Sequence, residues 1–168
     1  MLFERSPLQK FEKQLKGYIV IGHSGHRNIL DNQRLNIQKA LTEKLAEIKI
    51  SNSKPCILIT GYAEGADELA IAAAQANDIK IALLLAGPEE IDKLAALNTT
   101  EHVLSYQVEG SEDQLYTNQA DIILSKADHI LLCWDGIQNN KPGGGHRTFT
   151  NKCTMAIITS KKPACTNW

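Results

Sequence analysis

CILITGYAEGADELAIAAAQANDIKIALLL, residues 56–85, is the stretch that decides the fold class. It contains two short apolar runs, 56–60 and 79–85, with an alanine-rich helical pattern over 64–76 between them. Two runs of strand length joined by a helix predict a βαβ unit, whose strands are parallel. The run 79–85 is of the apolar kind found in strands that are buried on both faces of a parallel sheet. The alanines between the runs would let the helix lie close against that sheet.

The same alternation continues on both sides of this unit. Upstream, a strand at 17–22 precedes a long amphipathic helix at 31–48, for which Asp31 is the expected N-cap. Downstream, the patterns predict a helix at 89–97, a strand at 102–108, a helix at 112–126, a strand at 129–134, a helix from about 146 and a strand at 156–159. This order predicts a Rossmann-like three-layer α/β fold with a mainly parallel sheet flanked by helices. The chain, 1–168, is then one domain with an N-terminal extension, 1–16, and a divergent C-terminal end, 146–168.

The composition is that of an ordinary globular protein, with 43% hydrophobic residues and a formal net charge of −1. Such a balance disfavours nucleic acid as a partner, because binding it over a whole face normally needs a basic surface. No apolar run reaches the roughly 18–20 residues that span a bilayer, and the first residues lack the apolar core of a signal peptide. We therefore expect a cytoplasmic protein with no membrane partner. The four cysteines form no CxxC pair, which favours small apolar roles over zinc or disulfides.

Three segments that follow strands carry chemically unusual residues, and ligands of open α/β sheets bind at the carboxyl ends of the strands. The first segment, GHSGHR at 22–27, is predicted to be a tight turn with a hydroxyl, two imidazoles and a guanidinium. The alternative is a turn whose histidines only satisfy local backbone groups. The candidate ligand-binding residues here are Gly22, His23, Ser24, Gly25, His26 and Arg27.

The second segment, 60–67, leads from a strand into the first turn of a helix, where backbone N–H groups suit an anion. Glu64 and Asp67 are both expected on that turn. Carboxylates there either stabilise the helix end or hold ribose hydroxyls and act as acid–base groups. The candidate ligand-binding residues are Gly61, Glu64, Gly65 and Asp67.

The third segment, 135–147, contains a triple glycine before a predicted helix, which suits backbone amides wrapped around a phosphate. No Asp or Glu follows Asp135, whereas five Lys or Arg residues do, and this excess favours an anionic ligand. The alternative is a solvated loop without a ligand. The candidate ligand-binding residues are Asp135, Gly143, Gly144, Gly145 and His146.

GHSGHR, ITGYAEGADELAIAAA and ADHILLCWDG followed by KPGGG resemble the SLOG superfamily. Its relatives include LONELY GUY phosphoribohydrolases, lysine-decarboxylase-like proteins, molybdenum-cofactor carriers and DNA-processing protein A. The chain most resembles a bacterial branch of small proteins that carry a Gly-His-Arg turn after the first strand, and the resemblance covers residues 17–145. It implies a nucleotide-like ligand, with contacts from Gly25, His26, Arg27, Gly61, Glu64, Gly65, Asp67, Asp135 and Gly143–Gly145. Mg²⁺ would be expected only as an ion carried in with the phosphate of such a ligand.

The chain departs from the hydrolytic members, whose PGGxGTxxE motif supplies a catalytic Glu. The corresponding residues 142–150 contain no carboxylate. Three functions therefore stay open: a nucleotide-binding sensor or carrier, an enzyme acting on an N-glycosidic or phosphoribosyl bond, and an interaction protein with a degenerate site. In the enzyme, Glu64, Asp67 or Asp135 would be the catalytic carboxylate. A homodimer or larger homo-oligomer is expected by analogy, through the helices at 64–76 and 112–126.

Overall fold

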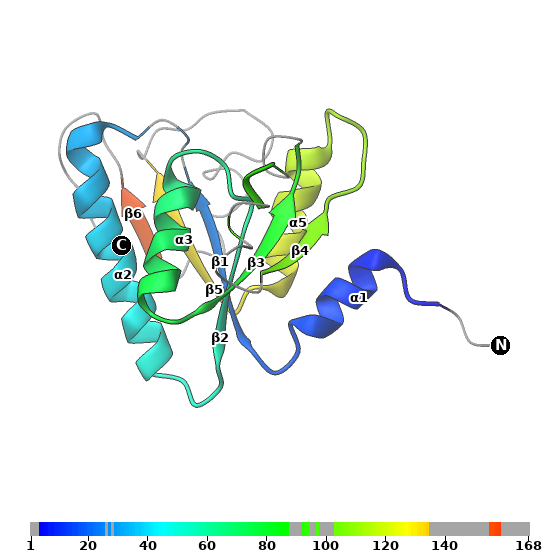
Figure 1. Cartoon of the computed structure of the whole chain (residues 1–168), viewed down its shortest axis with the longest axis horizontal. Helices are drawn as coiled ribbons and strands as arrows, with labels where there is room; N and C mark the ends of the chain where they lie inside the picture. Colours follow the sequence, from blue (N-terminus) through cyan, green and yellow to red (C-terminus); the bar gives the residue numbers. More distant parts are fainter. Residues whose placement is uncertain are drawn as a thin grey trace.

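The computed structural model describes residues 4–25, 27, 29–87, 92–94, 97 and 103–133, together with the backbone of 134 and 155–158. Six strands form one sheet in the order β4-β3-β2-β1-β5-β6, and every neighbouring pair is parallel (Figure 1). The strands are β1 (Ile19–Gly25), β2 (Cys56–Thr60), β3 (Lys80–Leu85), β4 (Leu104–Gln107), β5 (His129–Trp134) and β6 (Met155–Ile158). The helices described in full are α1 (Pro7–Gln14), α2 (Asp31–Ile50), α3 (Ala66–Ala76) and α5 (Leu115–Lys126). The predicted Rossmann-like α/β class is confirmed.

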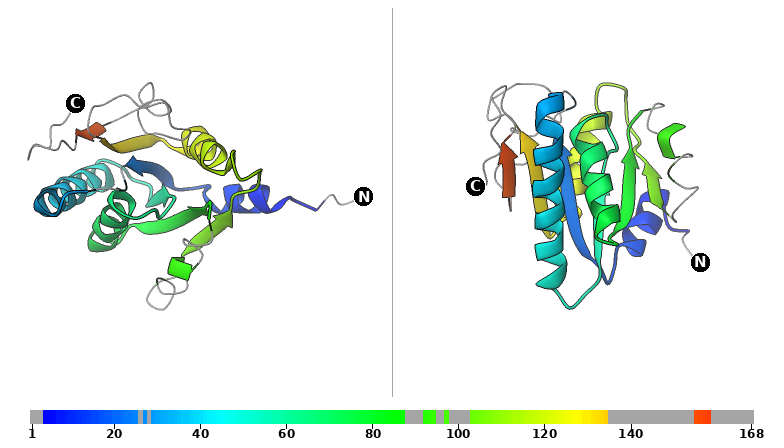
Figure 2. Two further views of the ribbon diagram at one scale, coloured as in Figure 1. Left: turned by 90° about the horizontal axis from the view of Figure 1, so that it is seen from above. Right: turned by 60° about the vertical axis from the view of Figure 1, so that its left-hand side comes forward.

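The helices lie in two layers, one on each face of the sheet (Figure 2). α2 and α3 cover one face, and the four alanines of α3 that point to the sheet are fully buried there: Ala66, Ala70, Ala73 and Ala74. The predicted close approach of this helix is therefore confirmed. α1 and α5 cover the other face, where Phe11 and Leu15 of the N-terminal region pack with Ile123 of α5. Strand residues alternate between these two cores, as the period of two in a β-strand requires.

Several predicted boundaries differ from the structure. Strands 56–60 and 129–134 are confirmed to the residue, and the strands expected at 79–85, 102–108 and 156–159 are β3, β4 and β6 with shifted ends. Asp31 is not the N-cap of α2, because Leu30 holds that position and makes no side-chain cap bond. Asp31 instead begins the helix, where its negative charge still favours the helix dipole. The helices predicted at 89–97 and from 146 lie wholly or partly outside the described residues.

The N-terminal region carries an element that the sequence patterns did not predict. Ser6 accepts a hydrogen bond from the backbone N–H of Gln9, and the Gln9 side chain accepts one from the N–H of Ser6. This reciprocal capping box, followed by Pro7 at the first helical position, starts α1. The helix that begins here contributes Phe11 to the core on the second face of the sheet.

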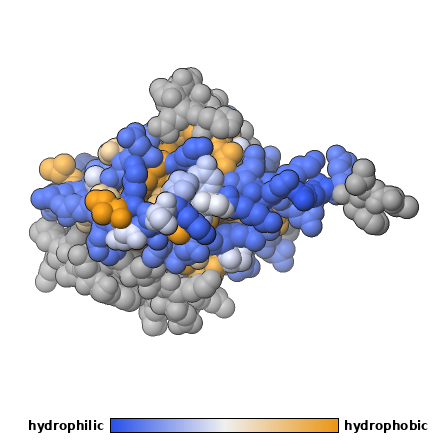
Figure 3. All heavy atoms as spheres, turned by 90° about the horizontal axis from the view of Figure 1, so that it is seen from below, coloured by the Kyte–Doolittle hydropathy of each residue, from blue (hydrophilic) through white to orange (hydrophobic). Residues whose placement is uncertain are grey.

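The strand order reverses between β1 and β5. From β1 the chain builds outward through β2, β3 and β4, and then returns to the other side of β1 with β5 and β6. Open α/β sheets bind ligands outside the carboxyl ends of the strands at such a reversal. The carboxyl ends lie at the top of Figure 1. The opposite end of the molecule is mostly hydrophilic over its described residues, with apolar side chains in small separate spots (Figure 3). Within the described ranges, no helix combines the length and apolar character needed to cross a membrane.

Candidate functional site

The segment predicted as a turn after the first strand is largely strand. β1 continues through His23 and Ser24 to Gly25, so the expected turn at 22–27 is wrong for its first four residues. Pairing explains the difference, because Gly22 to Gly25 lie in parallel register with Ile130 to Cys133 of β5. That pairing partner is more than a hundred residues away in the sequence, where local patterns carry no information about it.

The glycines of β1 make room for helices rather than for a turn. A Cβ atom on Gly22 would lie 2.7 Å from Ile123 Cγ2 of α5. A Cβ atom on Gly25 would lie 2.5 Å from Ala66 Cβ of α3 and 2.9 Å from Cys133 Cβ of β5. All three distances are far inside van der Waals contact, so the helices approach this strand at distances that only glycine allows.

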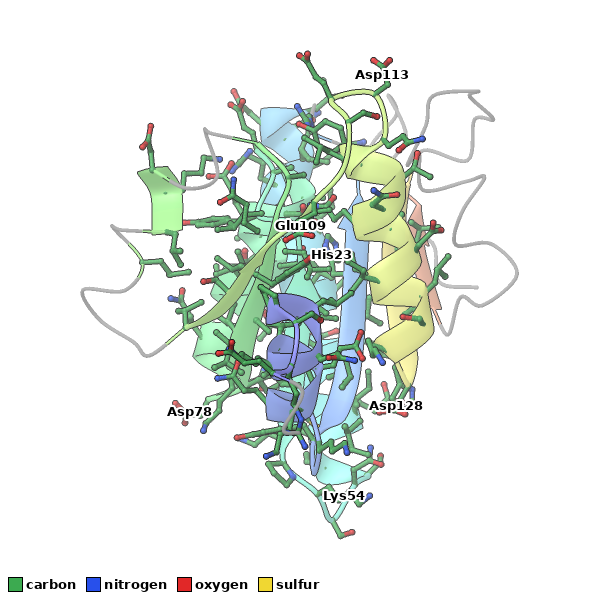
Figure 4. The ribbon with its side chains drawn as sticks, turned by 90° about the vertical axis from the view of Figure 1, so that its right-hand side faces the viewer. His23, Lys54, Asp78, Glu109, Asp113 and Asp128 are labelled. Carbon is green, nitrogen blue, oxygen red and sulfur yellow. The ribbon has the colours of Figure 1, made fainter. Side chains whose placement is uncertain are left out.

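His23 and Asp67 form a buried polar pair beneath the first turn of α3. Nδ1 of His23 lies 2.7 Å from Oδ1 of Asp67, and the two residues are 1% and 7% exposed. Because a carboxylate only accepts hydrogen bonds, the Nδ1 nitrogen carries the proton. Figure 4 shows His23 in the interior, between the end that carries Asp113 and the opposite end that carries Lys54. Neither side chain of the pair is open to solvent.

The turn between β2 and α3 is held by carboxylates of the helix itself. Oδ2 of Asp67 accepts a hydrogen bond of 3.0 Å from the N–H of Ala63, and Oε1 of Glu68 accepts one of 2.9 Å from the N–H of Gly65. Glu64 was expected on the first helical turn, and that prediction is wrong: α3 starts at Ala66, and Glu64 is exposed in the preceding turn. Gly65 has a φ of 90°, which is not a helical value, so α3 begins only at the next residue.

Within the part of the chain that the structure describes, two buried polar atoms have no hydrogen-bond partner: Nε2 of His23 and Oγ1 of Thr60. The ladder between β1 and β2 pairs Gly22 with Ile59, so His23 and Thr60 come next on the two strands. Sequence reasoning did not single out Thr60. A hydroxyl at the end of an otherwise apolar strand, CILIT, is the signal that could have identified it.

Gln119 of α5 also contributes to this edge of the sheet and was missed. Its Nε2 donates a hydrogen bond of 2.7 Å to the carbonyl of Leu84 in β3, and its amide fills the space where a Cβ of Gly61 would lie. The absence of a side chain at Gly61 therefore makes room for Gln119 of α5. No sequence signal marks Gln119, because its role depends on a contact between distant elements.

Arg27 lies just past the carboxyl end of β1 and is exposed. Its guanidinium carbon lies 5.1 Å from the ring centroid of Tyr116, which belongs to the first turn of α5. A guanidinium over an aromatic face is attracted by the ring quadrupole, so the contact orients the positive charge. This residue stands on the β1 side of the strand-order reversal.

The remaining candidates are His26, Asp135, Gly143, Gly144, Gly145 and His146, which all lie outside the described residues. Ser24 is described and half-buried within β1. Among the residues with described side chains, no three His, Cys, Asp or Glu groups come together as a metal site would require.

The fold defines an α/β protein of Rossmann-like topology, and the described candidate residues lie at or beside the carboxyl ends of β1 and β2. No known family model and no curated protein sequence matches the chain. Its structure is similar to that of DNA processing protein A (DprA) from Streptococcus pneumoniae, with a TM-score of 0.54 and 15% sequence identity. The similarity covers 92% of this chain and 62% of that protein, so this chain spans less than two thirds of DprA. At this level of identity the similarity establishes a shared fold.

Proposed function

We propose that this protein is a SLOG-type module that binds a nucleotide or another phosphorylated small molecule at the carboxyl ends of β1 and β5. The strand order carries the proposal, because the reversal between these two strands is where open α/β sheets bind their ligands. The similarity in fold to DprA supports the same superfamily, which the resemblance of the sequence motifs already suggests.

Arg27 is the residue we assign to the anionic part of the ligand. A guanidinium stays charged at any physiological pH and presents several donors in a planar fork that matches phosphate oxygens. Its position past the end of β1 and its contact with the Tyr116 ring hold that fork beside the reversal point. The triple glycine and the basic residues after Asp135 would supply further phosphate contacts.

Binding without hydrolysis is the function we favour over N-glycosidic cleavage. Such cleavage needs a carboxylate close to the substrate and an acid for the leaving base. Both oxygens of Asp67 accept internal hydrogen bonds, and His23 is fully buried, so neither group is presented to a ligand. Glu64 is exposed in the turn before α3, and Asp135, the third candidate carboxylate, lies outside the described residues.

A ligand screen with matched variants tests the proposal. Thermal unfolding is followed with nucleoside mono-, di- and triphosphates, cyclic nucleotides and ribose 5-phosphate, and hits are titrated by calorimetry. A ligand that binds only the native state raises Tm with the logarithm of its concentration. We expect Arg27→Ala to weaken the binding of a hit by about tenfold or more, the usual effect of losing a charge-assisted hydrogen bond. Arg5→Ala, an exposed arginine before α1, is the control and should bind as the wild type does.

Two results would overturn the proposal. The first is the absence of any saturable shift on folded protein. The second is binding of a single-stranded oligonucleotide, lost in Arg27→Ala, without binding of any free nucleotide. That result would replace a small-molecule site with a nucleic-acid site.

A further inference from the structure

We infer that His23 is a positioning residue: through Asp67 it holds the turn Gly61–Gly65 in the shape that borders the proposed ligand site. The inference rests on the proposed function for the identity of the site. The way in which His23 holds the turn is argued from its contacts, and these contacts can be tested without any ligand.

The turn adopts a conformation that it would not hold by itself. Tyr62 has a φ of 58°, a left-handed value that is uncommon for residues other than glycine, asparagine and aspartate. Such conformations are unfavourable and persist only where the surrounding contacts determine them. Gly65, with a φ of 90°, ends the same turn. The chain must therefore supply contacts that fix the residues between β2 and α3.

Asp67 supplies the central contact, because it bonds the turn and β1 at the same time. One oxygen accepts from the N–H of Ala63, the residue after Tyr62, and the other lies 2.7 Å from Nδ1 of His23. A carboxylate that is 7% exposed needs its hydrogen bonds, since an unpaired buried charge is strongly unfavourable. Loss of the His23 donor would therefore leave one buried oxygen of Asp67 without its hydrogen bond and weaken the hold of this carboxylate on Ala63.

The second nitrogen of His23 makes no hydrogen bond to any described residue. With the proton on Nδ1, Nε2 of a neutral ring is an acceptor, while the Thr60 hydroxyl on the neighbouring strand is a donor. Both atoms are buried, and neither has a partner among the described residues. His23 and Thr60 follow Ile21 and Leu58 at a spacing of two, which places both side chains on the face covered by α3. The two atoms do not bond each other, so the hydrogen bond to Asp67 is the described contact that fixes the ring. The order His23, Asp67, Ala63 thus connects β1, through the start of α3, back to the turn.

Two substitutions separate the functions of the two ring nitrogens. His23→Asn places an amide nitrogen where Nδ1 stood and keeps a donor for Asp67, but lacks Nε2. His23→Leu keeps a comparable apolar volume and lacks both nitrogens. If His23→Leu fails to fold, His23→Gln replaces it, because the longer side chain moves its amide one methylene away from the Nδ1 position.

Amide hydrogen exchange followed by NMR gives a readout that loss of global stability does not produce. The quantity compared is the exchange rate of the Ala63 amide relative to core amides of β3 such as Ile81. Global destabilisation raises both rates together, whereas release of the turn raises only the first. We expect the relative rate to rise by about tenfold or more in His23→Leu and to stay near the wild-type value in His23→Asn. An unchanged relative rate in His23→Leu would overturn the inference.

Ligand titration completes the test. For any ligand that the wild type binds, His23→Leu should bind more weakly and His23→Asn should restore most of the affinity. Equal affinity in all three proteins would overturn the assignment of the turn to the site. The last combination is a wild type that binds no ligand, with a relative exchange rate that is still raised in His23→Leu and not in His23→Asn. In that case His23 positions the turn, and the proposed function fails.

Discussion

At Gly25, α3 and β5 both approach β1 closely. The missing side chain lets Ala66, the first residue of α3, lie over the strand at the same level as Cys133 of β5. The start of α3 carries the carboxylates that hold the proposed ligand turn. A glycine that a sequence motif would assign to a ligand thus has a packing role that can be measured by itself.

Gly25→Ala should destabilise the protein by about 1–3 kcal/mol, the usual effect of forcing a methyl group into a packed core. The new Cβ would meet Cβ atoms of Ala66 and Cys133, which move only if the backbone moves. Urea unfolding gives the free energy of unfolding of the variant and the wild type.

The control is the double variant Gly25→Ala with Ala66→Gly. Removing the facing methyl group should recover part of the loss, even though glycine near a helix start lowers helix stability by up to about 1 kcal/mol. Strictly additive effects of the two substitutions would show that the clash does not set the energy.

The helix α1 covers the second face of the sheet beside β4. Phe11 is 2% exposed and its ring centroid lies 5.8 Å from that of Tyr106 in β4, with the rings tilted by 33°. Glu12 on the same helix lies 2.9 Å from Nζ of Lys126 at the end of α5, and both side chains are about a third exposed. The apolar contact and the ion pair therefore attach one helix to two other elements.

The apolar contact should dominate this attachment. We expect Phe11→Ala to lower the free energy of unfolding by about 3–5 kcal/mol, because it removes a buried aromatic ring and leaves a cavity. Glu12→Gln should lower it by less than about 1 kcal/mol, as is usual for exposed ion pairs. Chemical denaturation of both variants measures the two values. A loss below about 1 kcal/mol for Phe11→Ala would mean that α1 is only loosely attached.

The sequence predicted elements well where burial alone defines them. β2 and β5 are apolar runs with both faces covered, so hydrophobicity marks their ends. The second half of β1 was missed, because His23, Ser24 and Gly25 become strand only through pairing with β5. The start of α3 was placed two residues early, because the positive φ of Gly65 delays the helix.

The candidate site shows the same division between local and non-local information. The sequence identified His23 and Asp67 separately, as members of two different segments. It could not show that they bond each other in the core, since that contact joins a strand to a helix 44 residues later. Nor could it show that Gly22 and Gly61 face helix α5, which follows both in the chain. The sequence therefore predicted which residues to consider for the site, but it did not predict which of them contact one another.

At the scale of the whole molecule, burial keeps several weak acids in their neutral forms. Desolvation is the largest cause that raises the pKa of the Cys56 thiol and of the Tyr62 and Tyr106 hydroxyls. Nearby carboxylates add to the effect at the tyrosines, from Glu68 and Glu109. These groups lie on β2, on the turn after it and on β4, so their ionisation at high pH would destabilise several parts of the sheet.

The raised pKa values predict that stability falls as the solution becomes alkaline. Below the ordinary thiol pKa of 9.0, Cys56 is protonated in both states and contributes no pH dependence. Above it the unfolded chain loses that proton while the folded chain keeps it, and the tyrosines follow above 10.0. Stability decreases with pH wherever the unfolded state binds fewer protons, so the free energy of unfolding should fall from about pH 9 upward.

Urea unfolding between about pH 8 and about pH 10.5 measures this slope. Lysines also titrate in this range, and comparison with variants separates their contribution from that of Cys56 and the tyrosines. Cys56→Ala should flatten the slope just above pH 9, whereas Tyr106→Phe should act only at higher pH. A slope that neither variant changes would show that desolvation of these side chains does not link folding to proton uptake.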